Sequence, residues 1–184
     1  MTPFRPRSAL AVVVSTCLAW SEARSQVPGG HFYAGLTVER VQPFGYSLIT
    51  HVRLGGGSGG GLYFSYELRR FFVGLELASG SFAHDDTYSR PWLFALRPGV
   101  ILGTGNIAPY VAAGYAGMAY GALGDDAANG TGLSSEVGLL LFRSRRSMRA
   151  SVALQYNHPL HDSGTGKGNI EQLSWASFAV RMQL

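Results

Sequence analysis

Leu173-Ser-Trp-Ala-Ser-Phe-Ala-Val-Arg-Met-Gln-Leu184 closes the chain, and two kinds of side chain alternate along it. One face of an extended strand would carry Ala176, Phe178, Val180, Met182 and Leu184, and the other Trp175, Ser177, Ala179, Arg181 and Gln183. Successive side chains of a strand point to opposite faces, so one face can contact lipid while the other stays wet. The stretch therefore predicts a strand of a membrane β-barrel.

Seven earlier stretches repeat this alternation. The eight expected strands cover residues 31–39, 61–68, 71–78, 92–102, 109–121, 133–142, 149–157 and 173–184. Their connections alternate between long polar loops (40–60, 82–90, 123–132, 159–169) and short turns (69–70, 104–108, 143–147). In an even-stranded barrel with both termini in the periplasm, the long loops are extracellular and the short turns periplasmic. We therefore expect an all-β fold, an eight-stranded antiparallel up-and-down transmembrane β-barrel.

Three local features qualify this assignment. Pro98 inside the fourth strand predicts a bulge or an unpaired position. The fifth strand, 109–121, is so rich in small residues that either face could contact lipid. The glycine-rich run 55–61 contains G-x-G-x-x-G, but it precedes a strand where a dinucleotide site needs a helix. We interpret it as a flexible loop that enters the second strand.

The first 25 residues have the pattern of a secretory signal peptide. A basic segment ending at Arg7 precedes an apolar run from Ser8 to Leu18, and Ala23 and Ser25 supply small residues at a cleavage site. This apolar run is too short to cross a membrane as a helix. We expect cleavage after Ser25, which leaves one barrel domain over residues 26–184. Cys17, the single cysteine, leaves with the leader, so disulfides are excluded; a lipoprotein signal at Cys17 matches its pattern poorly.

Charge excludes one large class of function. The leader carries three Arg and one Glu, so its removal lowers the formal net charge from +4 to +2. A nearly neutral chain has no basic stripe to neutralise phosphates, and we expect no nucleic-acid partner.

A soluble carrier barrel of the lipocalin type is the main structural alternative, because it also has eight up-and-down strands. Its apolar faces would point inward. The membrane interpretation is favoured because charged residues make up only 14% of the chain and those within strands lie on the polar face. Aromatic residues near strand ends also suggest the two interface girdles of a membrane barrel: Phe32, Tyr33, Phe71, Trp92, Tyr110, Tyr120, Tyr156 and Trp175.

Several of these stretches resemble one family, the small outer-membrane β-barrels of Gram-negative bacteria of the outer membrane protein A-like and opacity type (porin family). The resemblance covers roughly residues 31–184. It rests on Phe32-Tyr-Ala-Gly-Leu-Thr-Val38, Gly60-Gly-Leu-Tyr-Phe-Ser-Tyr66, Ala108-Pro-Tyr-Val-Ala-Ala-Gly114 and the alternating terminus. The family usually ends in Phe or Trp, whereas this chain ends in Leu184. It implies a monomer in the outer membrane that contacts lipopolysaccharide and is inserted by the barrel assembly machinery.

The inner face of such a barrel should carry six charged side chains. They are Glu67, Glu76, Arg97, Glu136, Arg149 and Arg181. An eight-stranded barrel is just wide enough for side chains to fill, and buried charges must be paired. We expect an internal Glu-Arg network that plugs the lumen, with Glu76, Arg97 and Glu136 near mid-height and the other three lower. The alternative is that these residues face trapped water singly.

One enzymatic alternative rests on a loose motif. His158, His161 and Ser163, followed by Glu171, faintly resemble the His-x-Ser and Glu arrangement of outer-membrane lipid A 3-O-deacylases. Leu160 stands where that family has Ser if His158 is the base.

Two acidic pairs in the loops, Asp85-Asp86 and Asp125-Asp126, could bind calcium but are better interpreted as solvated turn residues. The sequence indicates no cofactor, no metal and no catalytic residue. Its leading functional prediction is a non-enzymatic structural or surface-interaction protein whose four extracellular loops bind a surface ligand. A narrow channel is the remaining alternative.

Overall fold

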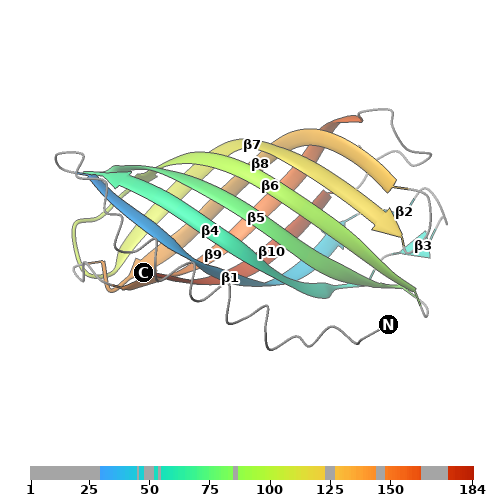
Figure 1. The fold of residues 1–184 in the computed structure, drawn as a ribbon, viewed down its shortest axis with the longest axis horizontal. Coiled ribbons are helices and arrows are strands. Elements are labelled where there is room, and N and C mark those ends of the chain that lie inside the picture. The colour runs from blue at the N-terminus through green and yellow to red at the C-terminus, as the bar shows by residue number, and fades with distance from the viewer. Residues whose placement is uncertain are drawn as a thin grey trace, which may run out of the picture.

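The computed structural model is a closed antiparallel barrel (Figure 1). It describes residues 30–44, 46–47, 52–53, 55–84, 87–122, 127–143, 148–162 and 174–184. The wall consists of β1 (Gly30–Phe44), β4 (Gly57–Leu68), β5 (Phe71–His84), β6 (Thr87–Ile101), β7 (Ala108–Ala122), β8 (Ala127–Leu141), β9 (Arg149–Asp162) and β10 (Ser174–Gln183). The short strands β2 (Tyr46–Ser47) and β3 (Val52–Arg53) pair with each other between β1 and β4. The predicted eight-stranded up-and-down barrel is confirmed.

Pairing of β1 with both β4 and β10 closes the sheet. A row of paired residues can be followed once around the wall, through Gly30, Leu68, Phe71, Val100, Val111, Val137, Leu154, Phe178 and Arg40. The row returns to β1 ten residues beyond its start, which corresponds to a strand tilt of roughly 40°. This tilt is visible in Figure 1. It brings inward side chains from different strands to the same height.

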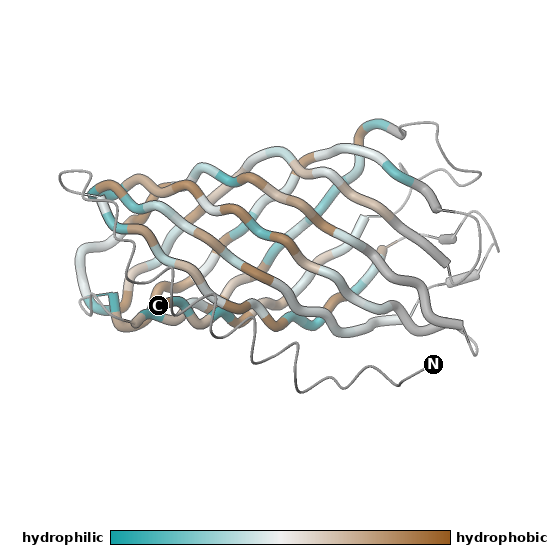
Figure 2. Tube along the Cα trace, in the orientation of Figure 1, coloured by the Kyte–Doolittle hydropathy of each residue, from teal (hydrophilic) through white to brown (hydrophobic). Residues whose placement is uncertain are grey.

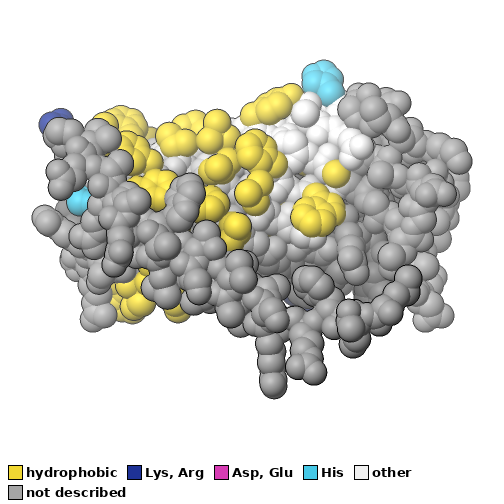
Figure 3. All heavy atoms as spheres, viewed as in Figure 1, with side chains coloured by type: hydrophobic (Ala, Val, Ile, Leu, Met, Phe, Trp, Pro, Cys, Tyr) yellow, Lys and Arg dark blue, Asp and Glu magenta, His cyan; other side chains and the backbone are white. Residues whose placement is uncertain are grey.

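The two faces of the wall are opposite in character to those of a soluble carrier barrel. Outward side chains such as Phe71, Trp92 and Met182 are about 60% exposed, whereas Arg97 and Arg181 are buried inside. Apolar and polar positions alternate along the strands in Figure 2, and Figure 3 shows apolar side chains gathered on the visible face. From Trp92 to Leu102 the outward apolar row is roughly 25 Å tall, the height of a membrane belt.

The strands are longer than expected at the end of the barrel where the long loops were placed, here called the loop end; the opposite end is the turn end. The predicted loop 82–90 is mostly strand, since β5 runs to His84 and β6 begins at Thr87. Much of 123–132 and the start of 159–169 are strand as well. Polar residues in these segments continue the backbone ladder beyond the apolar belt: on β5 the outward row changes from Leu77 to Ser79 and Ser81.

The structure settles three local questions. On β7, Val111 and Tyr115 are exposed and Tyr110 and Met118 are buried, so the odd-numbered face points outward. Pairing between β6 and β7 skips Arg97 and Pro98 without a change of register, which confirms an unpaired position there. The prediction of a flexible glycine-rich loop is wrong for 57–61, which pairs with both β1 and β5.

The aromatic girdle prediction is correct only in part. Phe32, Phe71, Trp92 and Tyr156 are exposed on the outer face. Tyr33, Tyr110 and Trp175 are buried in the lumen, because they occupy inward positions of their strands. Whether an aromatic side chain points outward therefore depends on which of the two alternating faces of the strand it occupies. It does not depend on how close the residue lies to the strand end.

Some predictions lie outside the described residues. They concern the leader 1–25 with Cys17, the acidic pairs 85–86 and 125–126, and Ser163 and Glu171 of the deacylase-like motif. The side chain of Tyr120 is not described either. In the described part of the chain, no helix is long and apolar enough to cross a membrane.

Candidate functional site

Four charged side chains meet in the middle of the lumen, and we call them the central cluster: Glu76, Arg97, Glu136 and Arg181. They come from β5, β6, β8 and β10. Arg97 Nη1 lies 2.6 Å from Glu76 Oε2 and 3.0 Å from Glu136 Oε2. Arg181 Nη2 lies 3.0 Å from the same Glu76 oxygen. Two cations and two anions, all nearly inaccessible to solvent, thus neutralise one another across the barrel.

The pair formed by Arg181 and Glu136 is bidentate. Nη1 donates to Oε1 over 2.6 Å and Nη2 donates to Oε2 over 2.7 Å. Tyr110 Oη also donates to Glu136 Oε1, and the ring of Tyr63 covers the Arg181 guanidinium at 4.1 Å. Parallel donors to one carboxylate are among the strongest pairings available to arginine.

Neutral side chains complete the central cluster. Gln155 Nε2 donates to Glu76 and Glu136 over 2.7 and 3.0 Å, and Ser177 Oγ donates to Gln155 Oε1 over 2.7 Å. Arg97 Nε donates to Ser134 Oγ over 2.7 Å. Every strand from β4 to β10 therefore contributes a side chain to this layer. These contacts keep the buried charges tolerable and help to fix the register of the wall around them. Glu76 Oε1, Arg97 Nη2 and Arg181 Nε have no hydrogen-bond partner among the described residues.

A second ion-pair group, the mouth cluster, lies at the turn end and consists of Glu67, Arg149 and Arg143. Arg149 Nη1 is 2.5 Å from Glu67 Oε2, and Arg143 Nη2 is 2.6 Å from Oε1. Arg149 also stacks on the Tyr33 ring at 3.7 Å. Arg143 donates to the carbonyl oxygen of Arg69 over 2.9 Å, so it ties its own turn to the turn between β4 and β5.

Apolar side chains fill the lumen beside and beyond these clusters. The upper apolar layer, near the loop end, contains Val41, Ala78, Leu93, Ala95, Ala116, Met118 and Trp175. The lower apolar layer, near the turn end, contains Phe72, Ile101, Ala108, Tyr110, Ala112, Leu140 and Ala153. All of them are buried. The lumen thus has a charged layer between two apolar ones, with the mouth cluster beside the lower.

One buried carboxylate of the lumen makes no ion pair among the described residues. Glu39 is 6% exposed, and its Oε2 has no hydrogen-bond partner among the described residues. The interior then holds four carboxylates (Glu39, Glu67, Glu76, Glu136) and four guanidiniums (Arg97, Arg143, Arg149, Arg181), all within the described part of the chain. Their formal charges cancel.

All six charged residues expected on the inner face are found there, but one is in a different group. Arg181 was placed low with Glu67 and Arg149; it belongs instead to the central cluster, because strand tilt raises β10 relative to β4. Arg143 was not expected in the lumen, because it lay in a predicted turn. Glu39, Gln155 and Ser134 were already on the polar face, so alternation could have identified them.

A different polar arrangement lies on the outer wall near the loop end. His158 Nδ1 is 2.7 Å from Ser174 Oγ, and the His158 ring stacks against that of Tyr156. His158 is a member of the deacylase-like motif, but its observed partner is Ser174, which the sequence had not suggested. Asp162 is the nearest acid along β9 and its side chain is not described. In the described residues, no group of three or more His, Cys, Asp or Glu could hold a metal ion.

Comparison with known proteins identifies the fold. No family model and no curated protein sequence matches the chain. Among solved structures, Neisserial surface protein A is similar with a TM-score of 0.69 and 12% identity, over 85% of this chain and 98% of that one. The N-terminal β-barrel domain of OprF from Pseudomonas aeruginosa is similar with a TM-score of 0.51 and 20% identity, over 84% and 99%. This chain therefore has the fold of the small eight-stranded outer-membrane barrels.

Proposed function

We propose that the protein is a non-enzymatic barrel of the outer membrane that presents its loop end at the cell surface and does not conduct through its lumen. The observation that carries this proposal is the central cluster, in which the guanidiniums of Arg97 and Arg181 and the carboxylates of Glu76 and Glu136 meet across the barrel. A pore of comparable strand number would need this space for water.

The outer wall supports membrane insertion. Its outward row is apolar over roughly 25 Å, which matches the belt of a transmembrane barrel. A wall of this kind in water would expose far more apolar surface than monomeric soluble proteins do. The shared fold with Neisserial surface protein A, a surface protein by its name, supports a role at the cell surface.

The closed lumen is supported by three successive layers. An ion entering from the loop end would meet the upper apolar layer before the central cluster, and then the lower apolar layer or the mouth cluster. If the side chains of one layer were removed, the other layers would still fill the lumen. This argues for a structural or loop-presenting role over a narrow channel.

Membrane placement, a closed lumen and removal of the leader can each be measured. Purified protein should require detergent for solubility, and it should migrate differently on a gel before and after boiling. In planar lipid bilayers it should show no steady conductance. Solubility without detergent would contradict the membrane placement, and a large steady conductance would contradict the closed lumen. N-terminal sequencing of exported protein should begin at Gln26, as the expected leader requires.

A second candidate function, hydrolysis of a lipid ester, is favoured by the contact between His158 and Ser174. A histidine within hydrogen-bond reach of a serine hydroxyl is the minimal arrangement of an activated nucleophile. The pair lies on the outer wall, where an ester of a membrane lipid could reach it. Mass spectrometry of lipid A from cells that express wild type, Ser174→Ala or no protein tests this candidate. Identical lipid A in all three samples rejects the candidate. Lipid A that has lost an acyl chain in cells with the wild type, but not in cells with Ser174→Ala, establishes it.

A further inference from the structure

Arg40 is unusual because it points away from the lumen. Among strand residues whose side chains are described, it is the one Lys, Arg, Asp or Glu on the outward face of the wall. It is exposed and pairs across the sheet with Phe178 on β10 and Ser58 on β4. A guanidinium on the lipid-facing side is unfavourable unless it reaches the interface or a counter-charge.

The position of Arg40 places it at the upper edge of the apolar belt. It lies four residues before Phe44, where β1 ends at the loop end. Polar outward side chains lie beside and above it, namely Ser58 on β4, Gln42 on the same strand and, farther up β10, Ser174. Its outward neighbours Phe178 on β10 and Val38, lower on β1, are apolar. In the membrane placement proposed above, this level corresponds to the boundary between the headgroups and the hydrocarbon region of one leaflet.

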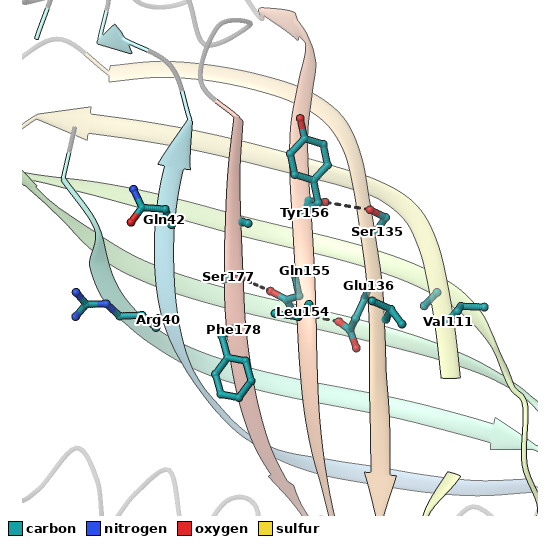
Figure 4. A pocket seen from close by; sticks show the side chains of 13 residues that line it. Arg40, Gln42, Val111, Ser135, Glu136, Leu154, Gln155, Tyr156, Ser177 and Phe178 are labelled. Atoms are coloured by element: carbon teal, nitrogen blue, oxygen red, sulfur yellow. Dashed lines mark hydrogen bonds between the residues drawn. The ribbon is translucent and has the colours of Figure 1, made fainter. Parts of the chain in front are cut away.

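A furrow on the outer wall leads down from Arg40 into the belt. It has a volume of about 690 Å³, and Figure 4 shows Arg40 and Gln42 at one end and Val111 at the other. Its lower edge is the row of paired residues Val111, Val137, Leu154, Phe178 and Arg40. The row above it contains Ser135, Tyr156, Ala176 and Gln42, and the small side chains of Ser135 and Ala176 leave the hollow. Across four strand spacings the furrow is about 19 Å long.

We propose that the Arg40 furrow binds one phosphorylated lipid of the outer leaflet, with an acyl chain along the furrow and a phosphate at the Arg40 guanidinium. The apolar lining from Val111 to Phe178 suits a hydrocarbon chain, and the single cation at its upper end suits an anionic headgroup. Arginine binds phosphate through two parallel hydrogen bonds, which an ammonium group cannot reproduce.

A second furrow on the wall supplies a matched control. It is similar in volume, about 590 Å³, and lies over β4 to β8 between Leu77, Phe94 and Ala119. None of the residues that line it is charged. If the hollow shape alone retained lipid, both furrows would retain it. The proposal requires that only the furrow with Arg40 retains it.

The test is retention of lipid A by the full-length folded protein in a phosphate-free detergent, counted by native mass spectrometry. Wild type should retain one molecule of phosphorylated lipid A. Arg40→Gln should need about tenfold more lipid for equal occupancy, and Arg40→Lys should fall between them. Ala176→Phe, which fills the Arg40 furrow, should also weaken retention. Ala119→Phe in the second furrow and Arg70→Gln in the turn between β4 and β5 should behave as wild type.

Three results would overturn the proposal: equal retention by all variants, equal retention of dephosphorylated lipid A, or complete displacement by inorganic phosphate alone. The last would identify a phosphate site that does not need the acyl chain. Heat-modifiable mobility confirms that each variant is folded. The inference rests on the membrane placement proposed above, and the two fail differently: unselective lipid retention by a detergent-dependent barrel overturns the inference alone, whereas solubility without detergent overturns the placement.

Discussion

Arg181 holds both carboxylate oxygens of Glu136, at 2.6 and 2.7 Å, although the two residues lie 45 positions apart and their strands are not neighbours. Strand β9 separates β8 from β10 in the wall. The contact therefore passes over β9 inside the lumen and links two strands that backbone hydrogen bonds do not join directly. Its energetic consequences can be measured with single substitutions.

Replacing Glu136 by Gln should destabilise the barrel strongly. The substitution leaves Arg181 with a single anionic partner, Glu76, and weakens the ion pair of Arg97. Removing one partner of a buried pair costs about 3 to 5 kcal/mol, because an uncompensated charge stays buried. Urea-dependent unfolding in detergent micelles, followed by tryptophan fluorescence, measures the loss.

Glu39→Gln provides the matched control for that experiment. Glu39 is also a buried carboxylate of the lumen, but it has no ion pair among the described residues and one oxygen without a partner. Neutralising it removes a charge that is costly to bury. We expect unchanged or slightly higher stability. Equal losses for Glu136→Gln and Glu39→Gln would show that the ion pairs of the central cluster do not set the difference.

The two arginines of the mouth cluster should differ in importance. Both contact Glu67, but the side chain of Arg149 is 2% exposed and that of Arg143 is 17% exposed. Water can compensate more of the contact at Arg143. Arg149→Ala should therefore lower the free energy of unfolding by more than Arg143→Ala in the same urea titration. The reverse order would mean that the turn contacts of Arg143 outweigh its partial exposure.

Two glycines on β7 should respond in opposite ways to substitution by Ala. A Cβ atom at Gly114 would lie 1.9 Å from the carbonyl oxygen of Leu96 on β6, whereas one at Gly117 would meet nothing within 4 Å. Gly114→Ala must push two backbones apart and should cost about 1 to 3 kcal/mol. Gly117→Ala should be tolerated. Refolding yield, read as the heat-modified gel shift, separates the two, and equal yields would contradict the close approach.

Opening the upper apolar layer alone should not make a pore. Trp175→Ala removes its largest side chain and should destabilise the barrel by about 3 to 5 kcal/mol. The central cluster and the layers at the turn end would still fill the lumen. Planar-bilayer recordings should therefore stay silent. Steady conductance of this variant would show that the apolar layer is the sole barrier.

Individual residues show which side-chain orientations could be predicted from the sequence. Alternation placed Glu76, Arg97 and Glu136 on one face correctly, since parity in a strand follows directly from the backbone. The girdle assignment of Trp175 and Tyr110 was wrong because it used residue type and strand position. Trp175 already lay on the polar face of its strand, and the face of Tyr110 had been left open.

Strand ends were harder to predict than strand faces. Polar residues in 82–90 resemble a loop by composition, yet they pair as the extension of a hairpin beyond the apolar belt. Backbone pairing needs no particular side chain once the neighbouring strand is in place. Composition therefore marks where the apolar belt stops and not where the strand stops.

The sequence by itself determined the number of strands, their alternating faces and the set of charges that those faces carry, because a period of two is a local property of the chain. Only the tertiary structure decided which face is inside, which carboxylate meets which guanidinium and which cation is left outside. One physical reason is the tilt of the closed sheet, because a shift of ten residues around the wall raises Arg181 to the level of Glu136. The other is backbone pairing, which extends β1 to Phe44 and so places Arg40 beside Phe178 on the outer surface.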